Sequence, residues 1–490
     1  MGFSLRDAGL VACRVGLLLS IAVPARAEDL LSLYREALLQ DPEYQAARYS
    51  LEIAEQKAPE ARAALLPTLS IVGGESKQKG EASFSEAPYE DREVRSRNWS
   101  LQLSQPLFRP AAWAGYRQAD AQVRQAQAQF RQASQELILR CAQAYFDAVL
   151  AQESLSVALA QADAVEQQWI LARRNFEVGI ATVTDVHEAK SRLDLARSQK
   201  IAAENELAVR LSELEKIVGK PAQRLPALKP QAELPSPQPA DVAAWVERSG
   251  SGSPGVAMLM AAAEASEYEV TRSRSGHVPT VDLNASYGTT YSSGSMTSPT
   301  DVPARSRSGQ IGVQLTVPIW SGGAVSSRVA QAEAALGKAR ADLEAAKRQA
   351  ATLVRQTYSG VVSGHAQIEA LDSAVASSRD AVEANRIGYR IGTRINIDVL
   401  NAEQQLYTAK RDLVRAKTET LMQGLRLKAA VGELGDADVA AINQLLETPC
   451  GQSPCPMLPS PRNCVVWPNW PSNKPRQFCA SCPCWARSPG

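Results

Sequence analysis

The sequence contains one segment that occurs twice, 213 residues apart. In the first copy Gly179 is followed, after five residues, by Asp185-Val186, and in the second copy Gly392 is followed in the same way by Asp398-Val399. The chain on both sides is rich in alanine and has apolar residues at helical spacing. A glycine followed by an aspartate before that periodicity resumes indicates the end of one helix and the start of another. Each copy therefore predicts a corner at which two long helices reverse direction.

The duplication extends over most of the chain. Three prolines of the first half recur 212 residues later, Pro42 as Pro254, Pro67 as Pro279 and Pro106 as Pro318. A repeat of fixed period indicates copies of one structural unit. We therefore expect a first repeat over 28–219 and a second over 251–448. The Pro- and Ala-rich stretch 220–250 is then the linker between them.

Each repeat contains two predicted strands, because apolar and polar residues alternate there. The clearest case is Ile311, Val313 and Leu315, which are separated by polar or small residues. This alternation gives each strand one apolar and one polar face. The predicted strands cover about 68–77, 97–107, 280–291 and 309–318, with polar loops from Lys77 to Arg97 and from Ser292 to Ser308.

Long helices make up most of what remains. Small and apolar residues follow a three-four spacing that continues without a break up to each corner. A helix from residue 111 to 176 is about 100 Å long at 1.5 Å per residue. The predicted helices cover about 111–176, 183–218, 323–389 and 396–431. The fold class is mainly α, with coiled-coil helices and a smaller β part.

The two ends of the chain differ from the repeats. Arg6 and Arg14 precede an apolar run that is followed by Ala25-Arg26-Ala27, so 1–27 is a predicted signal peptide that directs export from the cytoplasm. At the other end, 449–490 holds six of the eight cysteines among many prolines. This tail has no counterpart in the first repeat, and we expect it to be disordered.

The composition argues against several function classes. A formal net charge of +1 gives no reason to expect a nucleic-acid partner. The three histidines, His187, His277 and His365, are far apart and near no cluster of ligands. We find no activated nucleophile, paired acids or phosphate-binding loop. The sequence therefore predicts a protein that is not an enzyme and holds no cofactor or metal.

Four strands with an apolar face cannot close a barrel within one chain. No stretch after the signal peptide has the roughly 20 apolar residues of a membrane helix, so a membrane crossing would have to use the strands. Open strand edges in lipid cost several kcal/mol for each unpaired backbone group. The chain must therefore form an oligomer, and a trimer gives twelve strands. Pro106 and Pro318 are the predicted strand-to-helix bends, because proline ends the ladder of hydrogen bonds.

Two motifs, each present twice, resemble the TolC family of outer-membrane exit ducts. One is the strand-proline-aromatic segment at 105–108 and 317–320, and the other is the corner with its glycine and Asp-Val. The resemblance covers about 28–447. It implies a homotrimer of a Gram-negative bacterium, with a 12-stranded β-barrel in the lipid of the outer membrane and a helical barrel crossing the periplasm.

The family resemblance also implies partners and cargo. Members of the family dock onto a periplasmic adaptor (membrane fusion protein) and an inner-membrane pump, either ABC-type or proton-driven. They carry secreted polypeptides in type I secretion or small toxic compounds in efflux. The corners form the periplasmic entrance, which is closed at rest.

The same resemblance suggests residues for the periplasmic gate. The family positions that hold the entrance shut match Tyr389 and Arg394 on the second corner, facing Asp185 and Thr184 on the first. Such bonds contribute on the order of 1 kcal/mol each, so threefold repetition would keep the gate closed. Asp398 matches the first of two pore-lining acidic rings. The second ring position is Asn401 here, so we expect weaker cation binding.

Two other classes of protein remain open at this point. A periplasmic adaptor also combines a helical hairpin with strands, but it would have one hairpin rather than two tandem copies. A trimeric coiled-coil surface adhesin could share the barrel and the coiled coil without channel activity, and it would not need the matched residues at the corners.

Overall fold

The computed structural model describes residues 29–447, except 85–87, 180–181, 223–224, 230–231, 233, 301 and 395. The predicted signal peptide 1–27 and the predicted tail 449–490 lie outside the described residues.

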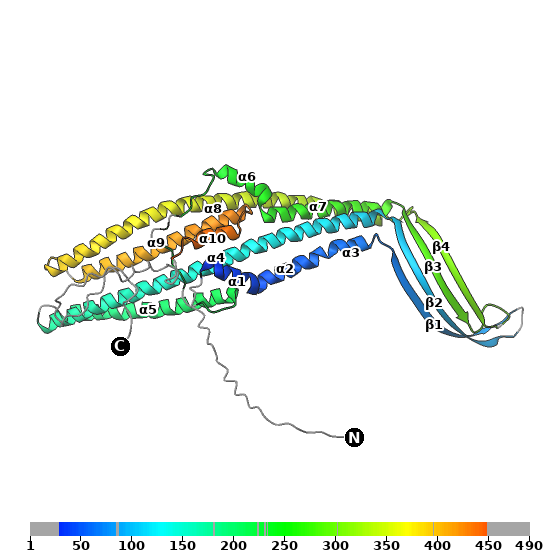
Figure 1. Cartoon of the computed structure of the whole chain (residues 1–490), viewed down its shortest axis with the longest axis horizontal. Helices are drawn as coiled ribbons and strands as arrows, with labels where there is room; N and C mark the ends of the chain where they lie inside the picture. Colours follow the sequence, from blue (N-terminus) through cyan, green and yellow to red (C-terminus); the bar gives the residue numbers. More distant parts are fainter. Residues whose placement is uncertain are drawn as a thin grey trace, which may run out of the picture. The chain divides into compact units, whose positions relative to one another are not determined.

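The first repeat begins with three short helices, continues with two strands and ends with two long helices (Figure 1). In chain order these are α1 (Leu30–Gln40), α2 (Pro42–Glu55), α3 (Lys57–Ala63), β1 (Thr68–Ala82), β2 (Glu90–Phe108), α4 (Pro110–Glu177) and α5 (Val183–Val218).

The second repeat has the same order, and one short helix follows it. Its elements are α6 (Val242–Gly252), α7 (Pro254–Arg274), the 3-10 turn η1 (Ser275–His277), β3 (Thr280–Ser292), β4 (Ala304–Thr316), α8 (Ala324–Arg390), α9 (Asn396–Ala430) and α10 (Asp436–Asn443). The four long helices begin and end within one residue of the bounds expected from the sequence.

The predicted linker over 220–250 is wrong for its last part, because α6 begins at Val242. This helix is the second copy of α1. The Asp29 side chain accepts a hydrogen bond from the Ser32 N–H at 3.0 Å, and the Asp241 side chain accepts one from the Ala243 N–H at 2.9 Å. Each aspartate satisfies a free amide at its helix N-terminus. The second repeat therefore starts about ten residues before the predicted boundary.

The four strands form one antiparallel sheet in the order β1-β2-β3-β4, so the two repeats meet between β2 and β3. Its register aligns apolar residues across the sheet in one row, Leu69, Leu103, Ala285 and Ile311. The next row is polar and consists of Ser70, Gln102, Ser286 and Gln310. Directly paired residues point to the same side of a sheet. The predicted apolar and polar faces therefore run across all four strands.

The strands are longer than the sequence predicted. The segment from Lys77 to Arg97 was expected to be a loop, yet β1 continues to Ala82 and β2 begins at Glu90. Salt bridges between the strands take the place of an apolar pattern. Arg97 contacts Glu75 at 3.1 Å, and Lys79 contacts Glu93 at 3.0 Å. In the second hairpin, β4 begins at Ala304, inside the other predicted loop.

The strand-to-helix bend predicted at Pro106 is wrong. Pro106 lies inside β2, next to a bulge opposite β3, and the strand continues to Phe108. Proline fits there because pairing with β1 ends at Ser104, so one side of the strand needs no N–H donor. The chain turns instead at Arg109, before Pro110 starts α4. In the second copy Pro318 lies in the connection between β4 and α8.

The long helices pack as two antiparallel hairpins, α4 with α5 and α8 with α9 (Figure 1). Each hairpin reverses at a glycine in the left-handed region, Gly179 with φ of 78° and Gly392 with φ of 81°. Such a conformation at the end of a helix favours glycine. Among the residues that the structure describes, no helix combines the length and the apolar character needed to cross a membrane.

The main core lies where the two repeats meet, between the middle of α4 and the ends of α5 and α9 that are remote from the corners. Residues from α1, α4, α5, α9 and α10 pack together with the linker, and Tyr145 and Phe146 are among its largest buried side chains. The Tyr145 hydroxyl donates a hydrogen bond to the Pro226 carbonyl at 2.7 Å. This bond fixes the linker onto α4.

Candidate functional site: the two helical corners

The first corner is held together by a capping box. The Thr182 N–H and hydroxyl both donate to the Asp185 carboxylate, at 2.8 Å each, and the Asp185 N–H donates back to the Thr182 hydroxyl at 3.3 Å. Bonds from the Thr182 backbone and side chain stabilise the charged form and lower the pKa of Asp185. Asp185 therefore caps α5 as an exposed, ionised carboxylate.

At the second corner the predicted site residues have other partners. Arg394 lies 3.8 Å from the Asp398 carboxylate, one turn further along the same chain segment. Tyr389 is half-buried, and its hydroxyl accepts a hydrogen bond from the Asn175 side chain of α4 at 3.4 Å. This last bond joins the second corner to the end of α4, just before the first corner.

The bonds expected between the corners are not formed within one chain. Asp185 bonds to Thr182 rather than to Tyr389, and Arg394 pairs with Asp398 rather than with Thr184. Thr184 is exposed, and its side chain makes no hydrogen bond to any residue in the described part of the chain. The four residues thus lie at adjacent corners. Asp185 and Arg394 have local partners, Tyr389 bonds to Asn175 of the other hairpin, and Thr184 has no side-chain partner in the described part of the chain.

The two hairpins do contact each other close to the corners. The Arg192 guanidinium of α5 donates to the Asn401 side-chain oxygen of α9 at 3.1 Å. The chain neighbours of these two residues, Leu193 and Leu400, form a small buried cluster with Val165 of α4. Asn401, expected to line the pore at the second ring position, is therefore tied to α5 through its amide oxygen.

The sequence analysis missed one pair of charged residues near the second corner. The Glu403 side chain is 5% exposed and accepts from Arg386, which lies on the facing helix α8, at 2.6 Å. The other Glu403 oxygen, Oε2, is buried and has no hydrogen-bond partner in the described part of the structure. Glu403 lies three residues after Leu400 and three before Leu406. A charged residue among the apolar residues on one face of α9 was the sequence signal that indicated Glu403.

The described residues contain no group of three or more acidic, histidine or cysteine side chains placed to hold a metal ion. The contacts present at the two corners are hydrogen bonds and ion pairs, within and between helices.

The comparison with known families decides what kind of protein carries these corners. The family model described as "Outer membrane efflux protein" matches residues 33–220 and again 245–433. The chain belongs to this family. The two matched ranges coincide with the two structural repeats, and the second starts within α6. The match confirms the resemblance to outer-membrane exit ducts and places the protein in the outer membrane.

Outer membrane efflux proteins of known role are similar over nearly the whole chain. The alkaline protease secretion protein AprF of Pseudomonas aeruginosa is 35% identical, over 90% of this chain and 93% of its own length. The proteases secretion protein PrtF of Dickeya chrysanthemi is 33% identical, over 85% and 90%. The outer membrane protein TolC of Escherichia coli is 29% identical, over 91% and 90%. These relatives are channel proteins rather than enzymes.

Solved structures of outer-membrane channels have the same fold. The Campylobacter jejuni CmeC channel matches with a TM-score of 0.72 at 17% identity, over 85% of this chain and 89% of its own. The open state of the Neisseria gonorrhoeae MtrE channel matches with a TM-score of 0.67 at 21% identity, over 84% and 90%. The fold class expected from the sequence, long helices joined to a small membrane β part in two repeats, is confirmed.

Proposed function

We propose that the protein is the outer-membrane exit duct of a tripartite export system and works as a homotrimer. The observation that carries this proposal is the sheet, which has an exposed apolar face and two unpaired edges, β1 and β4. Leu69 on β1 is 66% exposed and Ile311 on β4 is 75% exposed. Three such sheets joined edge to edge give twelve strands, with apolar residues toward lipid and the polar row toward a water-filled lumen.

The junction between sheet and helices supports the same orientation. Large side chains gather there in both repeats, and Trp320 is 87% exposed and Ile319 94% exposed. In the first repeat Phe108 and Trp113 occupy the same region and are also exposed. Aromatic residues form girdles where membrane barrels meet water. In this proposal the junction marks the periplasmic boundary of the membrane, and the helices extend from it into the periplasm.

The corners are the periplasmic gate in this proposal. Tyr389, Arg394, Asp185 and Thr184 are all at least partly exposed, so partners on a neighbouring subunit can reach them. Their present hydrogen bonds and ion pair are accessible to water and contribute on the order of 1 kcal/mol each. Exchanging these bonds for bonds across the corners therefore costs little free energy. Asp398, paired with Arg394, would become available as an acidic ring once that arginine moves.

The cargo we propose is a secreted polypeptide, delivered by an inner-membrane ABC pump through a periplasmic adaptor. The relatives at 35% and 33% identity carry names that refer to the secretion of proteases. Efflux of small toxic compounds is the second candidate, because the Brucella suis relative at 27% identity is named an outer membrane efflux protein.

Single-channel recording from the purified full-length protein in planar bilayers tests the duct. We expect heat-sensitive trimers in outer-membrane fractions and a small conductance that is stable in time. A folded trimer without conductance would contradict the duct and favour an adaptor or an adhesin. Labelling of residues 116–170 on intact cells then separates these two, since only an adhesin exposes them at the cell surface. Two measurements on cells that lack the protein distinguish the two kinds of cargo. Loss of protease from the medium indicates a secreted polypeptide, and loss of drug resistance indicates small toxic compounds.

A further inference from the structure

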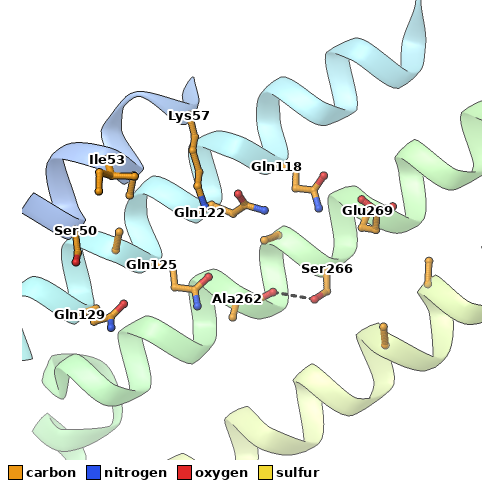
Figure 2. A pocket seen from close by; sticks show the side chains of 15 residues that line it. Ser50, Ile53, Lys57, Gln118, Gln122, Gln125, Gln129, Ala262, Ser266 and Glu269 are labelled. Carbon is orange, nitrogen blue, oxygen red and sulfur yellow. Dashed lines mark hydrogen bonds between the residues drawn. The ribbon is translucent and has the colours of Figure 1, made fainter. Parts of the chain in front are cut away.

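The helices next to the sheet lie side by side in one layer. α4 packs between α2/α3 and α7, and α7 packs between α4 and α8. An open groove of about 600 Å³ lies on this layer and is lined by residues of all these helices (Figure 2). The groove reaches from α2 to α8 across two intervening helices. It therefore lies on one face of the layer.

A row of glutamines from α4 follows the groove. Gln118, Gln122, Gln125 and Gln129 line it, and Figure 2 shows their side chains directed into the space between α4 and its neighbours. At 3.6 residues per turn these four positions lie within about 60° of one another and span about 16 Å. Gln118 accepts from Arg272 at 3.4 Å. Among the described residues, the other three side chains have no hydrogen-bond partner.

The rest of the lining is small and has little net charge. Alanines of α7 and α8, among them Ala265 and Ala332, form much of the surface. The charged side chains in the lining are Lys57 and Glu269, which have opposite signs. Such a surface offers no net charge and no apolar pocket that would select a particular side chain. Its free groups are primary amides, each with an acceptor and two donors.

We infer that this glutamine row is a binding track for the backbone of an extended polypeptide in transit. The inference rests on the proposed function and assigns the face that carries the groove to the lumen of the closed trimer. An extended chain advances about 3.3 Å per residue, so the row spans about five residues. Every residue except proline presents one N–H and one C=O, whatever its side chain. Free amides can therefore hold any sequence in passing without selecting one.

The test measures how long a peptide stays in the channel. The full-length trimer is recorded in a planar bilayer with a Gly-Ser repeat peptide as the probe. We expect Gln122→Leu/Gln125→Leu/Gln129→Leu to shorten the peptide's dwell time by about tenfold, because each amide bond contributes a small net stabilisation. Polysarcosine of equal length lacks N–H donors, and its dwell time should be shorter and change less.

Gln127→Leu is the matched control. It lies on the same helix, is exposed, and points about 180° away from the row. An unchanged dwell time in the triple variant, with normal conductance, would overturn the binding track and leave the duct intact. No conductance from the unsubstituted trimer would overturn both.

A single substitution tests the orientation of the groove separately. A bulky thiol reagent should reduce the current of Gln125→Cys and leave that of Gln127→Cys and of the unsubstituted protein unchanged. The opposite pattern would place the groove on the outer surface and overturn the inference.

Discussion

Arg386 donates two hydrogen bonds to one oxygen of Glu403, from Nε at 3.1 Å and from Nη2 at 2.6 Å. The pair joins α8 to α9 on the side of the hairpin nearest the second corner. The carboxylate is buried, whereas the guanidinium side chain is 57% exposed. Removing the arginine would therefore leave a buried carboxylate without its main partner.

We expect Arg386→Leu to destabilise the α8/α9 hairpin by about 2 kcal/mol, somewhat less than the loss seen for fully buried pairs, because the arginine is partly solvated. Native-state hydrogen exchange over residues 386–406 measures this. In Arg386→Leu/Glu403→Leu no buried charge remains, and most of the loss should be recovered. If the double variant loses as much as the single one, the charge pair is not the cause.

The capping box at the first corner gives a prediction for low pH. The pKa of Asp185 is lower in the folded protein than in the unfolded chain. The ionised carboxylate therefore contributes stability above the unfolded pKa of about 4, and this contribution is lost as the pH falls through the folded pKa. The protection of the first amides of α5 against hydrogen exchange, relative to the intrinsic exchange rate at each pH, should fall over that range.

Thr182→Ala should remove the capping contribution, about 1 kcal/mol, at neutral pH. Its amide exchange at the start of α5 should then depend less on pH than that of the unsubstituted protein. A pH dependence that persists unchanged in Thr182→Ala would show that another group titrates there.

The gate predicts a change in conductance. Tyr389→Phe/Arg394→Ser removes the hydroxyl and the guanidinium proposed to hold the corners together in the trimer. The conductance of the full-length protein in planar bilayers should rise several-fold. Tyr407→Phe is the control. It also removes one tyrosine hydroxyl, but Tyr407 lies on α9, away from the corner, so the conductance should be unchanged. Equal conductance in all three proteins would keep the channel and exclude this gate.

The connection from β4 to α8 depends on glycine more than on proline. Gly322 and Gly323 have φ of 61° and 83°, and an added side-chain carbon meets no neighbour at either position. Only backbone strain then opposes substitution, and we expect Gly323→Ala to destabilise the junction by about 1 to 2 kcal/mol. Pro318→Ala should cost less, because the strand has already ended at Thr316. The temperature at which the trimer dissociates compares the two variants. A larger loss of stability in Pro318→Ala than in Gly323→Ala would show that the proline, and not the glycine, determines the bend.

The long helices could be predicted to within a residue because one period of small and apolar residues runs up to each corner. The extended strands could not. The part of β1 and β2 beyond Lys77 carries charges instead of alternating apolar residues, and Glu75 and Glu93 stabilise it through partners on the opposite strand. Such pairs become visible only when the register is known.

The position of the proposed gate residues at the corners could be predicted from the sequence, but their contacts within one chain could not. Sequence correspondence selected Tyr389 and Asp185, and both lie at adjacent corners. Their partners within one chain, Asn175 and Thr182, follow from the packing of helix ends and from local capping. The bonds proposed for the closed state depend on contacts between copies in the proposed trimer, which a single chain does not contain.

The open edges of the sheet give a direct test of assembly. If β1 of one copy pairs with β4 of the next, residues on the polar face of both edges must meet, because paired residues share a face. Ser70 belongs to that face of β1, and Gln310 and Gln314 belong to that face of β4. In a background without native cysteines, Ser70→Cys should form disulfide-linked trimers with a cysteine placed at one of these β4 positions. Cysteines at Ile311 or Val313, on the apolar face, should not link to it. Equal linking at both sets of positions would show that the edges meet without a fixed register, and a closed barrel would then be excluded.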